Sequence, residues 1–174
     1  MNDAGTTEAT GLKPKGAHAP RWAWAVGTFF GTGLLKPGPG TWSSLATTLI
    51  WFALGRALPS GMRLPIHLAL LALSVAVGIP AATGIARALG KKDPSIVVID
   101  ETAGQLLTLL GAPLNWQSML VGLILFRVFD IAKPFPIRGL EKLPKGTGIV
   151  IDDLGAGLYA LALMHLLLHF AILK

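Results

Sequence analysis

The side chains in this chain that are best suited to chemistry are acids, and they occur in a few short stretches. Asp100 and Glu101 are adjacent in IVVIDETAGQ, Asp152 and Asp153 are adjacent in GIVIDDLGAG, and Asp130 lies in FRVFDIAKPFPIR between them. The 174 residues include only nine acids, so this clustering is informative. Carboxylate oxygens are the preferred ligands of hard cations such as Mg²⁺. The acids therefore predict a site for one or two such ions.

Acids in the first turn of a helix often have a simpler role, as caps or as partners of the helix dipole. That alternative applies to Glu101 and Asp152 when each is considered alone. Both acid pairs together with Asp130, in a chain where burying charge is costly, favour a functional cluster. Neighbouring residues on a helix point about 100° apart, so the two acids of a pair can have different partners. Which acid has which role stays open at this stage.

Basic side chains accompany the acids. Arg127 interrupts an apolar segment, where a charge normally requires a partner. Pro134 and Pro136 are expected to end that helix and to present Lys133 and Arg138 on a stiff, extended segment. These bases are either surface side chains paired with the acids or ligands for an anionic substrate.

A third polar stretch, LKPGPGTWSS over residues 35–44, is rich in glycine and proline and leads into an apolar segment. Thr41 is placed to cap the helix that follows. Free backbone N–H groups at that helix start, with the hydroxyl groups of Thr41, Ser43 and Ser44, could receive an anion. The same pattern is also ordinary for a turn before a helix, and it is not a Walker A loop.

Two histidines, His165 and His169, are spaced to share one face of the final helix and could bind a metal. No acid lies near them on that side of the chain. They are therefore expected to have packing or interfacial roles.

The remainder of the chain is strongly apolar. Hydrophobic residues make up 52% and charged residues 14% of the sequence, and the mean hydropathy is +0.61. We therefore predict an all-α integral membrane bundle of about five membrane segments plus an N-terminal interfacial helix. The absence of cysteine excludes disulfides and thiolate chemistry. The net charge of +6 comes from bases that flank apolar segments, which indicates an anionic lipid surface rather than nucleic acid.

The apolar segments define the expected elements. Residues 1–20 are expected to be a mobile tail, and residues 21–174 a single membrane-embedded domain. Residues 21–35 are expected to form an interfacial or re-entrant helix rather than a signal peptide, because no small-residue cleavage site follows. The later segments are expected over 41–58, 64–89, 102–111, 116–129 and 154–173. The third and fourth of these are short and form a hairpin.

Counting the crossings places the three polar stretches on one side of the membrane. The basic residues expected on that side are Lys36, Lys91, Lys92, Lys133, Arg138, Lys142 and Lys145, against Arg56, Arg63 and Lys174 on the other. The positive-inside rule makes the first side cytoplasmic.

A transporter, the main rival class, should carry its acids near the middle of the bilayer. A purely structural membrane protein would have no reason to gather five acids.

The polar stretches resemble the phosphatidylglycerophosphatase A family of bacterial inner-membrane enzymes, through PGPGTWSSL, IDETAG, FRVFDIAKPFPIR and GIVIDDLGAG in this order. The resemblance extends over about residues 25–160. The positions that carry over are Pro39, Gly40, Thr41, Ser44, Asp100, Glu101, Gly104, Arg127, Asp130, Lys133, Pro134, Pro136, Asp152, Asp153 and Gly157. Ser43 departs from the pattern, which has glycine at that place, and predicts an altered backbone approach there.

The resemblance implies Mg²⁺-dependent hydrolysis of phosphatidylglycerophosphate to phosphatidylglycerol and phosphate. The expected catalytic residues are Asp100, Glu101, Asp130, Lys133, Asp152 and Asp153, of which the five acids are also the expected metal ligands. The expected substrate-binding residues are Thr41, Ser44, Arg127, Lys133 and Arg138. An acid that binds no metal would position or deprotonate the attacking water. Another lipid phosphatase or a phosphatidyltransferase is an alternative, and the number of metals and the oligomeric state stay open.

Overall fold

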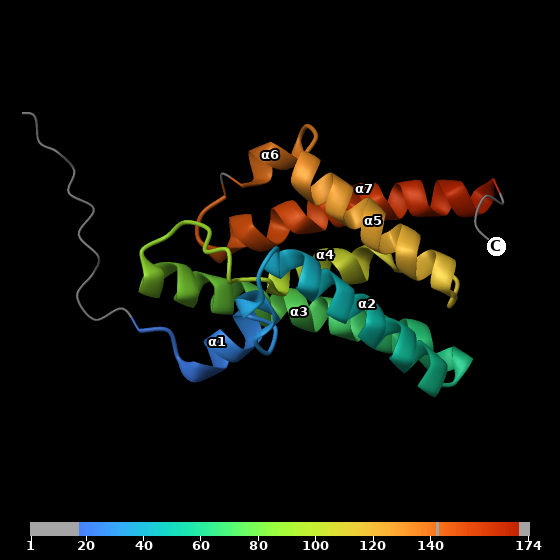
Figure 1. The fold of residues 1–174 in the computed structure, drawn as a ribbon, viewed down its shortest axis with the longest axis horizontal. Coiled ribbons are helices and arrows are strands. Elements are labelled where there is room, and N and C mark those ends of the chain that lie inside the picture. Colours follow the sequence, from blue (N-terminus) through green and yellow to red (C-terminus); the bar gives the residue numbers. More distant parts are fainter. Residues whose placement is uncertain (1–17, 142, 171–174) are drawn as a thin grey trace, which may run out of the picture.

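The computed structural model describes residues 18–141 and 143–170, and all regular structure in these residues is helical (Figure 1). The elements are α1 (Arg21–Gly27), the 3₁₀ helix η1 (Thr32–Leu34), α2 (Pro39–Ala57), α3 (Ser60–Leu89), α4 (Ile99–Thr108), α5 (Trp116–Ala132), α6 (Ile137–Leu140) and α7 (Gly146–His169). The predicted all-α class is confirmed. Most of the tail expected over 1–20 lies outside the described residues.

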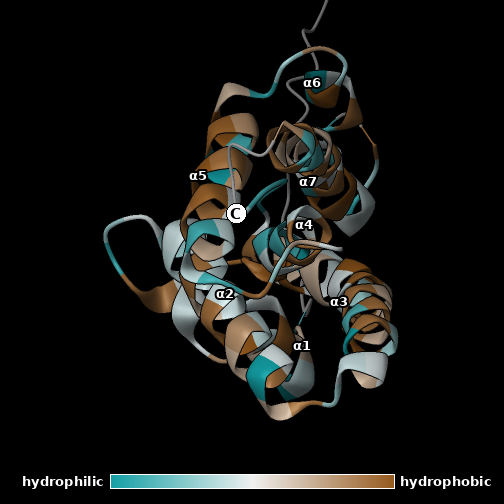
Figure 2. Cartoon of the chain, turned by 90° about the vertical axis from the view of Figure 1, so that its right-hand side faces the viewer, coloured by the Kyte–Doolittle hydropathy of each residue, from teal (hydrophilic) through white to brown (hydrophobic). Residues whose placement is uncertain are grey.

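The short helix α4 is the centre of the bundle. It contacts α2, α3, α5 and α7, and the end-on view shows it enclosed by these helices (Figure 2). Along α4, Ala103 and Leu106 belong to the buried core, as does Leu109 directly after the helix. Because neighbouring helices surround α4, the polar side chains of its first turn lie inside the bundle and not on its apolar outer surface.

The helices α4 and α7 approach each other closely because both present glycine at their contact. A Cβ on Gly157 would lie 2.5 Å from the carbonyl oxygen of Gly104, and a Cβ on Gly104 would lie 2.7 Å from the carbonyl oxygen of Asp153. Small residues of this kind let helix backbones meet where no hydrophobic driving force acts between them. The contact holds the first half of α4 against the part of α7 that carries Asp153.

Two of the described helices, α3 and α7, are long and apolar enough to cross a membrane, judged by length and composition. The helix α3 continues through Pro65 and Pro80 over 30 residues, so neither proline ends it. Figure 2 shows the hydrophobic colour dominating α3, α5 and α7. The expected five membrane segments are supported only in part. The hairpin arms are short, at 10 residues for α4 and 17 for α5, and α2 has hydroxyl side chains on its buried face.

Two boundaries near the N-terminus differ from the prediction. The helix expected over 21–35 ends at Gly27 and is followed by a turn in which Phe29 and Phe30 have positive φ angles. Thr41 is not the cap of α2, because the helix begins at Pro39 with Gly38 as its left-handed N-cap. Proline suits the first helical position, since its fixed φ is already helical and its missing N–H has no partner to lose.

Two further boundaries differ around the acids and bases. Helix α7 begins at Gly146, so Asp152 and Asp153 lie about two turns into the helix and not at its start. The glycine-containing stretch before them is helical because Gly146 packs against Ile79 and Thr83 of α3, where a larger residue would not fit. As predicted, α5 ends before Pro134, and Lys133 caps it in a left-handed conformation. Arg138 lies on the short helix α6 and not on an extended segment.

We expect Gly104→Ala to lower the stability of the bundle by about 1–3 kcal/mol, because the added methyl group would overlap the Phe126 ring and the Asp153 carbonyl. Thermal unfolding in detergent, followed by circular dichroism, measures this loss. Gly61→Ala is the matched control, since nothing lies within 4 Å of its added Cβ. Helix propensity should leave that control unchanged or more stable by up to about 1 kcal/mol. Equal unfolding temperatures for the two variants would contradict the close α4–α7 contact.

Candidate active site

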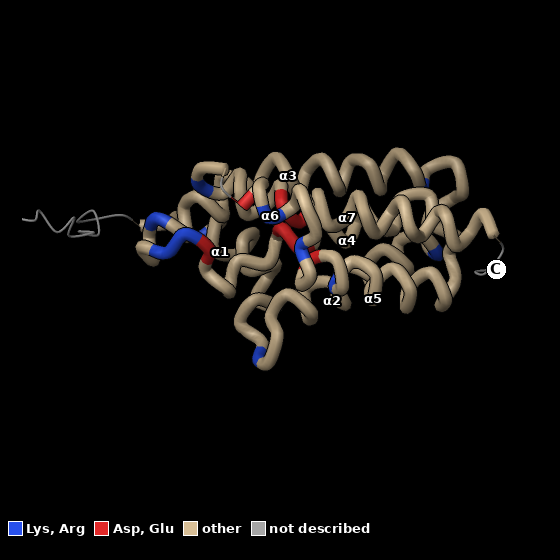
Figure 3. Tube along the Cα trace, turned by 90° about the horizontal axis from the view of Figure 1, so that it is seen from above, with Lys and Arg blue, Asp and Glu red and all other residues tan. Residues whose placement is uncertain are grey.

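Residues from all three polar stretches, which the sequence analysis placed on one side of the membrane, line one cavity of about 230 Å³. It lies beside the first turn of α4, and Figure 3 shows most of the acidic residues gathered near the place where α4, α5 and α7 meet. Its lining consists of Gly38, Pro39, Gly40, Asp93, Ser95, Val97, Asp100, Glu101, Arg127, Asp130, Lys133, Ile149, Asp152 and Asp153. Six acids and two bases thus share a small space, so the cavity is strongly negative when the acids are ionised.

Three of the acids form a tight cluster, which we call the carboxylate triad. Asp100 and Glu101 of α4 and Asp153 of α7 each offer an oxygen, and these oxygens lie within 4.8 Å of one another. Asp100 Oδ1, Glu101 Oε2 and Asp153 Oδ2 are buried, and none has a hydrogen-bond partner among the described residues. Buried polar atoms are normally paired, so a close group of carboxylates that each have an unpaired buried oxygen indicates a place for a cation.

Arg127 lies beside the triad on α5. Its Nη1 atom is 2.7 Å from Asp130 Oδ2 and 3.9 Å from Glu101 Oε1. The first contact joins residues one helical turn apart, and the second reaches across to α4. This explains why a charged residue is tolerated in an otherwise apolar segment, as the sequence suggested.

Lys133 bridges two acids at the end of α5. Its Nζ atom is 2.6 Å from Asp152 Oδ2 and 2.8 Å from Glu141 Oε1. Burial works to lower the pKa of Lys133, but its hydrogen bonds to Asp152 and Glu141 outweigh burial and raise that pKa above its usual value. The hydrogen bond from Lys133 lowers the pKa of Glu141 in turn. Lys133 therefore carries a permanent positive charge against the wall of the cavity.

The two acids of α4 have raised pKa values. Burial raises the pKa of Glu101 to about 7, and the charge of Asp130 adds to this effect. Burial also raises the pKa of Asp100 well above its usual value, and the neighbouring Glu101 charge raises it further. Both shifts reflect negative charges held close together away from water.

Glycine at the start of α2 makes room for Glu101. A Cβ on Gly40 would overlap Glu101 Oε1 and would lie 2.9 Å from Arg127 Nη1. Gly38, Pro39 and Gly40 all line the cavity, which places the positive end of the α2 dipole beside it.

Three residues expected to bind substrate do not line the cavity. Thr41 is exposed in the first turn of α2, and the Ser44 hydroxyl is buried and donates to the Gly40 carbonyl, 2.9 Å away. Arg138 is exposed, and its Nη2 atom donates to the Ala132 carbonyl at 3.4 Å. Arg127 and Lys133 are the expected substrate-binding residues that the structure brings to the cavity.

Three polar residues at or near the cavity were missed by sequence reasoning. Asp93 and Ser95 line it from the loop between α3 and α4, and Glu141 pairs with Lys133. Asp93 and Glu141 are two of the few acids in the chain, and that scarcity was a signal that could have identified them. Ser95 gave no such signal.

The model of the family described as phosphatidylglycerophosphatase A matches residues 25–168. The matched region contains every residue that lines the polar cavity. The chain belongs to the phosphatidylglycerophosphatase A family. The resemblance read from the four motifs is thereby confirmed, and the chain is a member of a family of lipid phosphatases rather than of transporters.

Curated relatives agree with this membership in the phosphatidylglycerophosphatase A family. A phosphatidylglycerophosphatase A of Haemophilus influenzae is 42% identical over 156 residues, which covers 88% of this chain and 92% of the relative. A protein of Bacteroides thetaiotaomicron named "Putative phosphatidylinositol-3-phosphatase" is 38% identical over 142 residues, covering 80% and 89%. A phosphatidylglycerophosphatase A of Escherichia coli is 33% identical over 147 residues, covering 83% and 81%. No solved structure matches the chain.

Ser43, the departure from the family pattern, has a structural partner in this chain. Its buried hydroxyl donates to the Val98 carbonyl at 2.8 Å and lies 3.1 Å from the Thr102 hydroxyl. The side chain therefore ties α2 to the turn of α4 that carries two of the triad acids.

The histidines of α7 lie away from the acids. His165 Nε2 is 2.9 Å from the Leu110 carbonyl, and the His169 ring packs against Phe170. Both contacts agree with the packing roles expected from the sequence.

We expect Ser43→Ala to lower stability by about 0.5–1.5 kcal/mol, because it removes a buried hydrogen bond between two helices. Ser44→Ala is the matched control: the neighbouring serine is equally buried, but its hydroxyl bonds only within α2. Serine bonds of that local kind add little to helix stability. Chemical unfolding of both variants in the same detergent measures the difference. A loss for Ser44→Ala as large as that for Ser43→Ala would contradict the role assigned to Ser43.

Proposed function

We propose that the protein hydrolyses phosphatidylglycerophosphate to phosphatidylglycerol and inorganic phosphate, with Mg²⁺ bound at the carboxylate triad. The observation that carries the proposal is the triad itself, with buried, unpaired oxygens in the region matched by the family. Two bases, Arg127 and Lys133, lie beside these oxygens and suit an anionic substrate. The cavity thus combines ligands for a cation with partners for a phosphate group.

The chemistry of the donor set fits Mg²⁺. All three triad members offer hard oxygen ligands, and this ion usually takes one or two carboxylates with water and phosphate completing its shell. A divalent cation would also counter the burial and the neighbouring negative charges that raise the pKa values of Asp100 and Glu101, because a nearby positive charge favours ionised carboxylates. When bound, the ion would supply charge stabilisation to the phosphate oxygens.

The two acids outside the triad have different surroundings. Asp130 is engaged by Arg127, and Asp152 is held through Oδ2 by Lys133. Asp152 Oδ1 is buried without a hydrogen-bond partner among the described residues and lines the cavity. This geometry favours Asp152 as the acid that orients the attacking water and accepts its proton.

The reaction forms a bond between phosphorus and the water oxygen and breaks the bond between phosphorus and the glycerol oxygen. Lys133 and Arg127 would balance the negative charge that develops on the phosphate oxygens. The departing glycerol oxygen takes up a proton from solvent, and the proton accepted by Asp152 returns to solvent. Lys133 holds the Asp152 carboxylate in place throughout, since it remains charged.

The proposed location is the inner membrane of a bacterial cell, with the cavity facing the cytoplasm. The spanning lengths of α3 and α7 support embedding, as do large exposed apolar side chains such as Ile124 and Ile131. Lys36, Lys91 and Lys92 are exposed in loops near the cavity side, and the positive-inside rule then favours a cytoplasmic orientation. The acyl chains of the substrate would stay in the bilayer.

We expect phosphate release from phosphatidylglycerophosphate by the purified protein to fall by at least about 100-fold in Asp152→Asn, because the variant loses the proton acceptor and the partner of Lys133. Asp3→Asn, in the tail expected over residues 1–20, is the control for an acid-to-amide change. Phosphatidylinositol 3-phosphate and phosphatidic acid are assayed as alternative substrates, since one relative is named for another lipid phosphate. No release of phosphate from phosphatidylglycerophosphate by the folded wild type would overturn the proposed substrate.

We expect Mg²⁺ to raise the unfolding temperature, because an ion that binds only the folded state stabilises it by about 2.7 kcal/mol at 100 times its Kd. Chelator should abolish both this shift and phosphate release. Glu101→Gln should remove most of the shift, whereas Glu141→Gln, outside the triad, should retain it. A Mg²⁺ shift that is unchanged in Glu101→Gln would place the ion elsewhere.

A further inference from the structure

A second cavity, of about 600 Å³, lies on the other side of α4 from the acids. From α4 and the turn after it, the lining includes Ile99, Thr102, Leu106 and Leu109, whose spacing of three or four residues puts them on one helix face. Asp100 and Glu101 fall on the opposite face, at about 100° per residue. The first turn of α4 therefore separates two cavities of opposite character.

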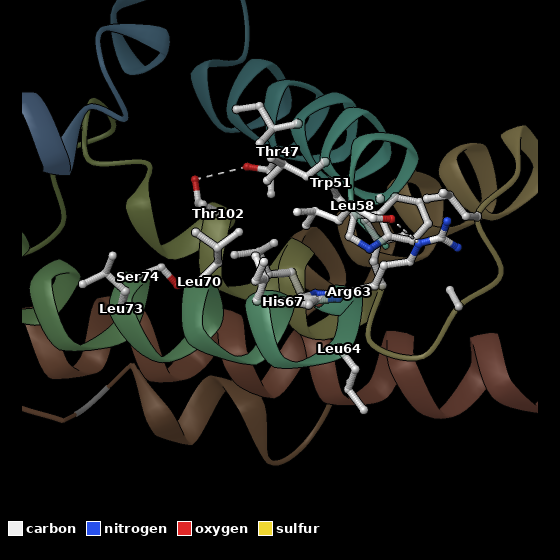
Figure 4. A pocket seen from close by; sticks show the side chains of 18 of the residues that line it. Thr47, Trp51, Leu58, Arg63, Leu64, His67, Leu70, Leu73, Ser74 and Thr102 are labelled. Carbon is white, nitrogen blue, oxygen red and sulfur yellow. Dashed lines mark hydrogen bonds between the residues drawn. The ribbon is translucent and has the colours of Figure 1, made fainter. Parts of the chain in front are cut away.

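The walls of this second cavity, which we call the apolar groove, are α2 and α3. Figure 4 shows Thr47 and Trp51 of α2 on one side and Leu70 and Ser74 of α3 on the other, with Thr102 of α4 between them. The helices α2 and α3 make few contacts with each other, because the groove separates them over most of their length.

The hydroxyl and imidazole groups inside the groove already have partners. Thr47 donates to the Thr102 hydroxyl at 3.3 Å, and His67 Nε2 lies 2.8 Å from the Leu106 carbonyl. Ser74 donates to a carbonyl of its own helix at 2.8 Å. The interior thus offers a ligand mainly apolar surface, and a polar ligand buried there would lose its hydrogen bonds to water without replacement. Hydrocarbon is the matching chemistry.

A positive charge marks one end of the groove. Arg63 lines it beside the connection between α2 and α3, is exposed, and donates from Nε to the Leu58 carbonyl at 3.2 Å (Figure 4). No acid of the described residues forms an ion pair with it. Arg56, in the last turn of α2, is exposed at the same end. The acids lie toward the other end of the bundle (Figure 3).

The dimensions suit one lipid chain. The lining residues of α3 extend from Arg63 to Val77, which corresponds to about 21 Å at 1.5 Å per residue. One leaflet of a bilayer has a hydrocarbon thickness of about 15 Å, half of the full core. A chain that starts at Arg63 can therefore lie along the groove for its whole length.

We propose that the apolar groove binds one acyl chain of an anionic phospholipid from the leaflet on the Arg63 side, with the lipid phosphate beside Arg63. This inference rests on the proposed membrane embedding and not on the phosphatase reaction. The bound lipid would fill the space between α2 and α3, and a close-packed apolar wall is the arrangement that holds helices in fixed positions.

The test uses the full chain in nanodiscs of phosphatidylcholine, to which phosphatidylglycerol with brominated acyl chains is added. Bromine quenches nearby indole fluorescence, and Trp51 lines the groove, so quenching should saturate at low phosphatidylglycerol fractions and should fall in Trp51→Phe. Leu70→Trp should reduce retention of phosphatidylglycerol by at least about tenfold when the protein is released for native mass spectrometry. Leu68→Trp, on the same helix but outside the lining, should retain it.

Arg63→Gln tests the headgroup contact without altering the packing of the bundle, since its side chain is exposed. We expect the preference for phosphatidylglycerol over phosphatidylcholine to fall by about tenfold. Phosphate release should stay normal in all of these variants. Equal retention of phosphatidylglycerol by the wild type, Leu70→Trp and Arg63→Gln would overturn the proposal. A raised KM of Leu70→Trp for long-chain but not short-chain substrate would also overturn it, because the groove would then hold the substrate's own chain.

Discussion

Asp100, Glu101 and Asp153 are held with carboxylate oxygens within 4.8 Å of one another, and like charges at that distance repel by about 1 kcal/mol in water and by several times more in a less polar interior. Such an arrangement persists only if the backbone around it is held firmly. The glycine contact between α4 and α7 supplies that constraint, because it brings the two helices closer than any larger residues would allow. The close contact thus keeps three carboxylates together in an arrangement that could hold a metal ion.

Two basic residues reduce the electrostatic repulsion among the acids of the polar cavity. Arg127 engages Asp130, and Lys133 engages Asp152, so the two acids outside the triad are neutralised within the chain. In the triad, only Glu101 lies near a base, at 3.9 Å from Arg127, and one buried oxygen of each triad acid has no hydrogen-bond partner among the described residues. This division separates acids that position bases from acids that can hold a metal. Residue 40 must be small because the Glu101 carboxylate lies against the start of α2, where a Cβ on Gly40 would overlap it.

The sequence was sufficient for the class of fold, for most helices and for the gathering of the polar stretches, because acids were scarce and apolar segments were long. It was less informative about helix starts. Gly146 looked like part of a loop, but it is helical because α3 presents a surface into which only glycine fits, and this is a tertiary effect. Thr41 looked like a cap, but the helix begins two residues earlier, at Pro39 with Gly38 as its N-cap. Asp93 and Ser95 reach the cavity from a loop whose path depends on where α3 ends, and no local pattern encodes that.

The first turn of α4 links the chemistry of the bundle to its apolar half. The residues of this turn divide between the two cavities: Ile99 and Thr102 line the apolar groove, and Asp100 and Glu101 line the polar cavity. Ser43 and Thr47 of α2 both bond to Thr102, so the same contact closes the groove on one side and steadies the acid-bearing turn on the other. A change in the spacing of α2 and α3 would therefore be felt first at this turn. Filling the groove with an apolar group, whether the acyl chain of the proposed lipid or the indole ring of the Leu70→Trp variant, would keep that spacing constant.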